Sequence, residues 1–168
     1  MNRDLQELQR ILQGAIAKAS SIPAQPVASG KWTSAQILEH LFLTYKNTTR
    51  GLRRCLEKGI ATFPPPTVRQ RIGVVVVLGF GYLPGGAKSP ERAVPKGLPA
   101  EQVKHDVLTE LEGMGIALEE CERIFGARTK LLDHPFLGSF SSRQWGRFHL
   151  VHGRHHARQI RERGGLVS

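Results

Sequence analysis

Apolar side chains recur every three or four positions along four stretches of the chain, which is the spacing of one face of an α-helix. The first stretch predicts a helix from about Arg3 to Ser20. The second opens at Thr33 with the sequence of a capping box, in which the Thr33 hydroxyl and the Gln36 side chain each bind a free backbone N–H group. This second helix is expected to end near Gly59.

Two further helices are predicted in the second half of the chain. One begins around residues 99–101, and its apolar positions alternate by four and three, as in the contact seam of a helical bundle. These positions are Val107, Leu111, Met114, Leu118, Cys121 and Phe125. The last helix begins at a second capping-box sequence, residues 141–144, and ends at the glycine pair 164–165. The four stretches together predict an all-α fold, a four-helix bundle.

Residues 60–98 join the second and third predicted helices, and this segment is rich in proline and glycine. The composition predicts a long crossover loop, and long connections of this kind are usually functional lids or interface segments when they are ordered. Within it, residues 72–78 form the apolar run Ile-Gly-Val-Val-Val-Val-Leu. This run fits either a short strand or a buried turn of helix, and its periodicity does not decide between them. We expect the segment to cover an end or a side of the bundle.

Length and composition are typical of one soluble globular domain, so residues 1–168 are expected to form a single domain with a substantial core. The chain holds no apolar run near the ~20 residues that a membrane-spanning helix requires, and its first residues lack the apolar core of a signal peptide. Cys55 and Cys121 lie at predicted inward helix positions and are expected to be reduced and buried. These features predict a cytoplasmic protein with no membrane partner.

The net charge of +10 is the one unusual feature of the composition. Much of it comes from two groups of basic residues, which are Arg50, Arg53, Arg54, Lys58, Arg69 and Arg71, and Arg143, Arg147, Arg154, Arg158, Arg161 and Arg163. Such a surface attracts nucleic acid or anionic small molecules. The basic residues are spread along amphipathic helices, and no known nucleic-acid-binding motif accompanies them. A solvated basic face is therefore favoured over specific nucleic-acid binding.

Four of the seven histidines lie between positions 149 and 156. On a helix, with about 100 degrees per residue, His149, His152 and His156 share one narrow sector and point at the core, whereas His155 lies on the flank. The spacing of His152 and His156 allows two imidazole nitrogens to meet one metal ion. The same spacing occurs among ordinary core histidines that bind no metal, so the pattern leaves both interpretations open.

A three-histidine metal site needs a ligand from another helix, and His40 is the candidate. It lies on the margin of the apolar stripe of the second helix and faces the same interior. The other interpretation of His40 is a partly buried histidine bonded to a backbone carbonyl. Its neighbour Glu39 can hydrogen-bond a ligand or a metal-bound water, but adjacent helix positions diverge by about 100 degrees, so a surface charge is the favoured interpretation.

Three segments of the chain, residues 32–41, 134–138 and 145–160, resemble the DinB-like superfamily and, within it, the group catalogued as the domain of unknown function DUF1569. The resemblance spans nearly the whole chain. It implies a four-helix bundle with a long crossover and a divalent metal ion, most often nickel or zinc, held by three histidines. The positions that match those histidines are His40, His152 and His156.

The chain departs from the simplest family pattern by adding His149 and His155. His149 lies one turn before His152 on the same face. It is therefore a candidate for an alternate ligand, a hydrogen-bond partner of a ligand or a proton carrier. A purely structural role for His149 is an equal alternative.

Relatives in the superfamily include thiol-dependent S-transferases that use bacillithiol or mycothiol, and others with hydrolase or isomerase activity. The resemblance therefore implies a divalent-metal-dependent enzyme of thiol-transfer or hydrolytic type, with a small-molecule substrate and a low-molecular-weight thiol among its expected partners. Basic residues near the pocket mouth, such as Arg154 or Arg158, would then favour an acidic cosubstrate. The alternative is a non-catalytic metal-binding or stress-associated protein that forms a homodimer.

Overall fold

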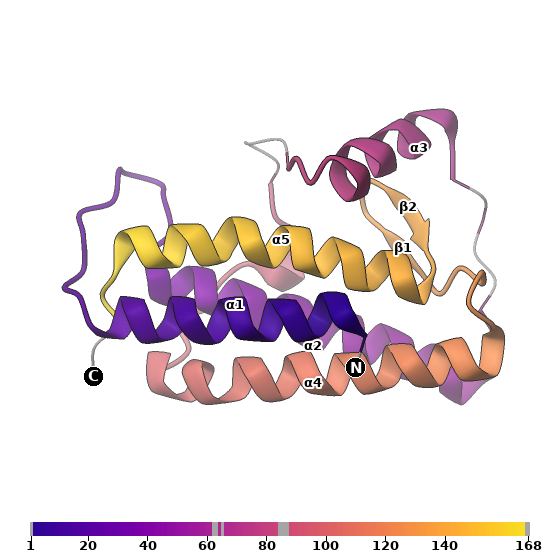
Figure 1. The fold of residues 1–168 in the computed structure, drawn as a ribbon, viewed down its shortest axis with the longest axis horizontal. Coiled ribbons are helices and arrows are strands. Elements are labelled where there is room, and N and C mark those ends of the chain that lie inside the picture. The colour runs from indigo at the N-terminus through magenta and orange to yellow at the C-terminus, as the bar shows by residue number, and fades with distance from the viewer. Residues whose placement is uncertain (1, 62–63, 65, 84–87, 167–168) are drawn as a thin grey trace.

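The computed structural model describes residues 2–61, 64, 66–83 and 88–166, and this part of the chain is mostly helical (Figure 1). The α-helices are α1 (Arg3–Ser20), α2 (Ser34–Lys58), α3 (Val68–Val74), α4 (Ala100–Phe125) and α5 (Ser142–Arg163). The other elements of the described residues are a π-helical turn η1 (Val75–Gly79), a 3-10 turn η2 (Glu91–Ala93), and an antiparallel hairpin of β1 (Leu132–His134) and β2 (Gly138–Phe140).

The boundaries of the four long helices agree with those that the sequence predicts. Thr33 and Ser141 cap α2 and α5, and each takes part in the reciprocal hydrogen bonds of a capping box. Gly59 ends α2 in the left-handed conformation, with a φ of 64°, which glycine adopts without steric penalty. The predicted apolar face of α4 is buried as far as Cys121, and Phe125 at its end is half-buried.

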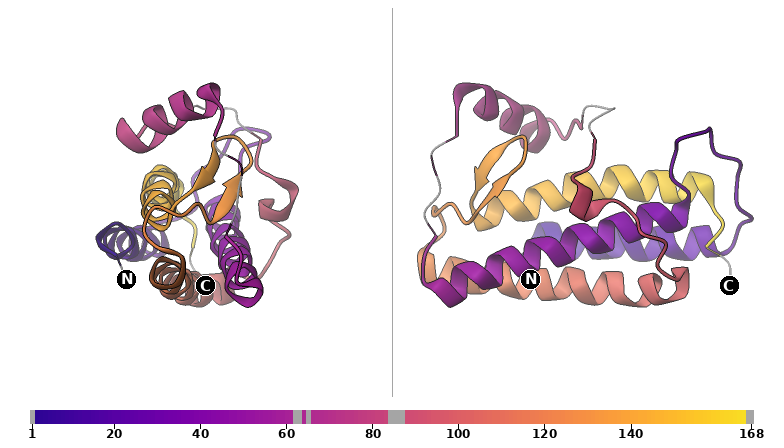
Figure 2. Two further views of the ribbon diagram at one scale, coloured as in Figure 1. Left: turned by 90° about the vertical axis from the view of Figure 1, so that its right-hand side faces the viewer. Right: turned by 180° about the vertical axis from the view of Figure 1, so that it is seen from behind.

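The four long helices lie side by side around one core (Figure 2), with α2 packed along α4 and α1 along α5. The chain runs in the same direction in α2 and α4, so the segment between them, residues 59–99, must return along the length of the molecule (Figure 1). The long connection that the sequence predicts is therefore present. It carries α3, η1 and η2, and its α3 lies above α5 in Figure 1.

This connection contains more regular structure than the long loop that its composition predicts. Residues 68–79 are helical, so the apolar run 72–78 is a helix and not a strand. It is not a buried turn either, because Val77 is its one buried side chain, while Ile72 and Val75 are exposed. Proline and glycine mark the segment as a connection, but a capping box that begins at Thr67 starts a helix inside it.

The hairpin of β1 and β2 departs from the predicted all-α fold. Its strands have three residues each, too few for an alternating pattern to be recognised in the sequence. The hairpin packs on α2 at Gly51, where a Cβ atom would come within 2.9 Å of the Leu132 side chain. It packs on α3 at Gly73, where a Cβ atom would lie 2.8 Å from the Leu137 side chain. The hairpin therefore bridges α2 and α3.

Both cysteines are free and buried, as predicted. The Cys55 thiol donates to the Leu131 carbonyl oxygen at 3.1 Å, and burial raises its pKa, so the thiol is protonated near neutral pH. Within the residues that the structure describes, no helix combines the length and the apolar composition needed to cross a membrane.

Candidate metal centre

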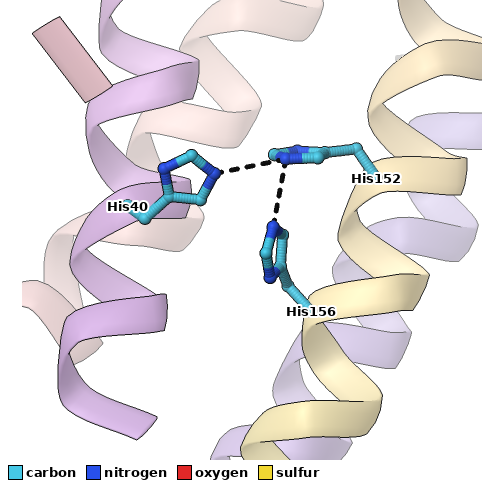
Figure 3. Close-up of side chains that lie close together, drawn as sticks. All are labelled: His40, His152 and His156. Atoms are coloured by element: carbon cyan, nitrogen blue, oxygen red, sulfur yellow. Dashed lines mark hydrogen bonds between the residues drawn. The ribbon is translucent and has the colours of Figure 1, made fainter. Parts of the chain in front are cut away.

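Three histidines from two helices meet at one point between α2 and α5 (Figure 3). His40 comes from α2, and His152 and His156 come from successive turns of α5. The Nε2 atom of His152 lies 3.2 Å from Nε2 of His40 and 3.1 Å from Nε2 of His156. One nitrogen from each ring lies within 4.8 Å of the other two. The structure thus brings together the three residues that the sequence indicates as metal ligands.

The far nitrogens of two of these rings are fixed by hydrogen bonds. Nδ1 of His40 donates to the Ala93 carbonyl oxygen of η2 at 2.8 Å, because a carbonyl can only accept. Nδ1 of His156 donates to Oε1 of Gln159, one turn later on α5, at 2.8 Å. A neutral imidazole carries one N–H proton, so these bonds leave the Nε2 atoms of both rings as free lone pairs. Ligand histidines in metalloproteins are held in this way.

The three Nε2 atoms cannot all be satisfied by one another. If His152 carries its proton on Nε2, that single proton faces two acceptors, and one contact stays unsatisfied. A cation would bind all three lone pairs at once. Tetrahedral coordination at a zinc–nitrogen distance of about 2.0–2.1 Å separates ligand nitrogens by about 3.3 Å, which is close to the observed separations of 3.2 and 3.1 Å. The donor set and these two separations therefore fit a divalent metal ion.

Burial keeps the three rings neutral. Desolvation lowers the pKa of His40 below its usual value, and it lowers the pKa of His156 to about 3, with a further contribution from the neighbouring His40. Burial, followed by the proximity of the other histidines, also lowers the pKa of His152. Neutral imidazole is the form that coordinates metal ions, so near neutral pH all three side chains are already in the ligand form.

The triad forms part of the wall of a large pocket of about 1480 Å³. Residues of α2, α5, the hairpin and the connection line this pocket, and many of them are apolar or aromatic. Trp32, Trp145 and Phe148 are among them, and the His152 ring stacks on Phe148 with ring centroids 5.5 Å apart. A molecule bound in this part of the pocket would therefore lie directly against the three histidines.

The family model described as protein of unknown function (DUF1569) matches residues 2–163. The chain belongs to the DUF1569 family. No curated protein and no solved structure matches the sequence. Membership confirms the narrower part of the resemblance seen in the sequence. Because the family description names no activity, the chemistry has to be inferred from the site.

In this DUF1569 protein, His149 stands apart from the triad. Its side chain is fully buried, and its ring packs against those of Tyr45 and Trp145, with centroid distances of 5.5 and 5.6 Å. Among the described residues, neither ring nitrogen of His149 has a hydrogen-bond partner, and burial lowers its pKa to about 3. The cluster of candidate ligands in the described residues does not include it. These contacts favour the structural role over the role of alternate ligand.

Two other histidines of the DUF1569 chain line the pocket beside the triad. His155 is half-buried on the flank of α5, as predicted, with its ring centroid 5.0 Å from that of His156. His134 at the end of β1 was not among the predicted site residues. It packs edge-on against Phe148 at 4.6 Å, and burial together with the nearby Arg92 lowers its pKa to about 4. No periodicity marks His134 in the sequence, because it lies in the short hairpin.

Glu39 is neither the surface charge that the sequence favours nor a partner of the histidines. Its side chain is 2% exposed, and its two oxygens accept the backbone N–H groups of Lys96, Gly97 and Leu98 at 2.6, 3.0 and 3.2 Å. The prediction was wrong because the connection folds over this part of α2 and supplies donors that a helical pattern does not reveal. Glu39 thereby holds the part of the connection that follows Ala93.

Arg154 and Arg158 do not line the pocket of the DUF1569 protein, contrary to expectation. Arg154 forms an ion pair with Glu7 of α1, and Arg158 lies 3.9 Å from Glu162 on its own helix. Each follows a triad histidine by two positions, which places it about 200 degrees further around α5. The basic residues that do line the pocket are Lys31, Arg54, Lys58, Arg69, Lys88, Arg92 and Arg163.

Proposed function

We propose that the chain is a divalent-metal-dependent enzyme of the DinB-like superfamily, a thiol-dependent S-transferase or a hydrolase, with His40, His152 and His156 as the ligands of its metal ion. The observation that carries the proposal is the convergence of three Nε2 atoms on the wall of a large pocket. The four long helices, and the long return segment between α2 and α4, support a bundle of the type found in that superfamily.

Three imidazole ligands favour a catalytic site over a structural one. Structural zinc sites are closed by four protein ligands, whereas catalytic sites use three and leave a position for water or substrate. The triad supplies three nitrogens and borders the pocket. A divalent ion held there supplies Lewis acidity, which activates water or a thiol near neutral pH. In S-transfer the thiol sulfur would displace a leaving group from the substrate, and the leaving group would depart with the thiol proton.

The chain's own contribution is to orient the three lone pairs. Imidazole ligands suit zinc and nickel, the two metals that the resemblance implies. The hydrogen bonds to Ala93 and Gln159 fix two of the rings. The Asn47 amide donates to the Arg92 carbonyl oxygen at 2.9 Å, and Glu39 binds the backbone that follows η2. These contacts tie the connection to α2 on both sides of Ala93.

Metal analysis of protein expressed without a histidine tag tests the ligand set. We expect about one nickel or zinc ion per chain, and we expect the His152→Ala variant to lose it, because the Nε2 atom of His152 lies within 3.2 Å of the Nε2 atoms of both other rings. His105→Ala is the matched control, since the His105 side chain is 85% exposed on α4. Absence of metal from the unaltered protein, or an unchanged metal content in the His152→Ala variant, would overturn the assignment.

Turnover assays then separate an enzyme from a metal-binding protein without activity. Bacillithiol-like and mycothiol-like thiols, each offered with an electrophilic acceptor, test S-transfer, and simple esters and amides test hydrolysis. Turnover that stops when the metal is removed supports the proposal. Stoichiometric metal without turnover of any of these substrates favours the non-catalytic alternative. We propose a homodimer together with that alternative, and the mass of the protein in solution tests it.

A further inference from the structure

We propose that the pocket beside the triad binds an elongated anionic amphiphile, a ligand with an apolar chain and a carboxylate or phosphate at one end. Arg54, Lys58 and Arg69 would hold the anionic end, and the apolar chain would lie along the pocket toward the triad. This inference deepens the proposed function by naming a class of ligand for the same pocket. It rests on the proposed function only for the reaction that would follow binding.

Basic residues dominate the charged lining of the pocket. Among the residues that the structure describes, seven lysines and arginines line it, against one acidic residue, Asp133. Arg54 and Lys58 lie one turn apart on α2, and Arg69 lies at the start of α3. Within the described ranges, none of these three side chains forms an ion pair. Cations without a counter-charge beside an apolar wall attract an anionic ligand.

The wall of the same pocket presents apolar side chains to solvent. Its lining includes four large hydrophobic residues that are exposed in the described structure: Ile60, Ile72, Val94 and Phe136. The buried rings of Trp145 and Phe148 line it as well. Exposed apolar surface gathered in a concave site is characteristic of a site for an apolar ligand group. A small polar ligand would leave this surface in contact with water.

Positions along α2 give the pocket its length. His40 and Arg54 both line it and are fourteen residues apart on this helix. At 1.5 Å per residue they are separated by roughly 21 Å along the helix axis. Lys58, one turn further, lies roughly 27 Å from His40 on the same scale. A ligand that touches both the triad and the basic end, formed by Arg54, Lys58 and Arg69, must therefore be long. A compact anion would occupy one end of the pocket alone.

Titration calorimetry with decanoate, hexanoate and neutral 1-decanol tests whether the ligand needs both an apolar chain and an anionic group. Each probe is used below the concentration at which it aggregates, on the protein as isolated and after chelation of its metal. We expect decanoate to bind more tightly than hexanoate, by up to about fourfold for each added CH₂ group. We expect 1-decanol to bind more weakly than decanoate, because it lacks the charge that Arg54, Lys58 and Arg69 recognise. Equal binding of decanoate and hexanoate, or of decanoate and 1-decanol, would overturn the proposal.

Charge reversal tests the basic end. The double substitution Arg54→Glu with Lys58→Glu should weaken decanoate binding about tenfold or more, because two attractions become repulsions. The matched control is Arg50→Glu with Arg53→Glu, which makes the same change of charge on exposed residues of α2 that do not line the pocket. Decanoate binding that falls equally in both variants would show only a general effect of net charge and would refute the site.

Filling the pocket tests the apolar wall. Val76 lines the pocket, whereas the adjacent Val75 is exposed and does not. Val76→Trp should remove most decanoate binding, and Val75→Trp should leave it within about twofold, as expected for a surface substitution. Equal effects of the two substitutions would place the ligand elsewhere. Decanoate binding by a protein that holds no metal as isolated would defeat the proposed function alone. Stoichiometric metal without decanoate binding would defeat this inference alone.

Discussion

At the scale of single residues, hydrogen-bond partners decide what the three histidines can do. An imidazole can present either nitrogen, and the partner on the far side of the ring determines which one carries the lone pair. Gln159 makes that choice for His156, and Ala93 makes it for His40. Two residues that would not themselves bind metal therefore set the direction of two lone pairs.

Replacement of Gln159 tests this orienting role. Gln159→Leu keeps much of the side-chain volume but removes the acceptor of His156 Nδ1–H, and we expect about 10–100-fold weaker metal binding, measured by competition with a chelator. Gln159→Glu keeps an acceptor at the same distance and should restore the affinity. Wild-type affinity in the Leu variant would show that Gln159 has no part in orienting the ring.

At the scale of elements, two consecutive residues of α2 contribute to the site. His40 points toward α5, while Glu39 accepts three backbone N–H groups of the connection. A carboxylate with three such donors is a strong anchor, because hydrogen bonds to charged groups are stronger than neutral ones. The helix thus holds the metal ligand and the segment that orients it as one unit.

Glu39→Gln measures the strength of that anchor. The amide loses the charge and replaces one acceptor oxygen with a donor, so we expect the free energy of unfolding to fall by about 2 kcal/mol, as measured by urea denaturation. The metal affinity should fall as well, since Ala93 lies in the anchored segment. Glu57→Gln, on the exposed face of the same helix, should change neither quantity. Equal stability of the two variants would contradict the anchor.

At the scale of the whole molecule, local signals in the sequence predict the long helices, and contacts between distant segments supply the rest. The caps at Thr33 and Ser141 depend on residues within one turn, so α2 and α5 could be placed from the sequence. The inward face of α5 likewise predicts His152 and His156. The burial of Glu39 could not be predicted, because its partners lie 57–59 residues away in the connection. The pocket lining has the same origin, since it forms only where the connection and the hairpin cover the helices.

The acid sensitivity of the metal-free protein is another property of the whole molecule. Burial lowers the pKa of His149 and His156 to about 3 and that of His134 to about 4, whereas histidines of the unfolded chain titrate near pH 6.5. As pH falls, the unfolded state takes up protons first. The contribution of these histidines to stability is therefore complete above about pH 6.5 and declines as the pH falls toward 4 and 3.

Thermal unfolding of the chelated protein checks this pH dependence. We expect the midpoint to fall steadily between about pH 6.5 and pH 4. His134→Phe should make the decline shallower, because it removes one of the buried titrating groups, and His105→Phe should leave the decline unchanged, because His105 is exposed. A midpoint that is constant over this range would contradict the burial of neutral histidines.

The separation of the triad along the chain has a consequence for the rates of metal exchange. His40 and His152 are 112 residues apart, on α2 and α5. The complete triad forms only after both ends of the polypeptide have folded together, since closing so large a loop is entropically costly and slow. An ion held there would stabilise only the closed state. A separation of α2 from α5 would leave the ion with the two histidines of α5 alone, so an ion that is lost faster when the molecule opens more often would report on that opening.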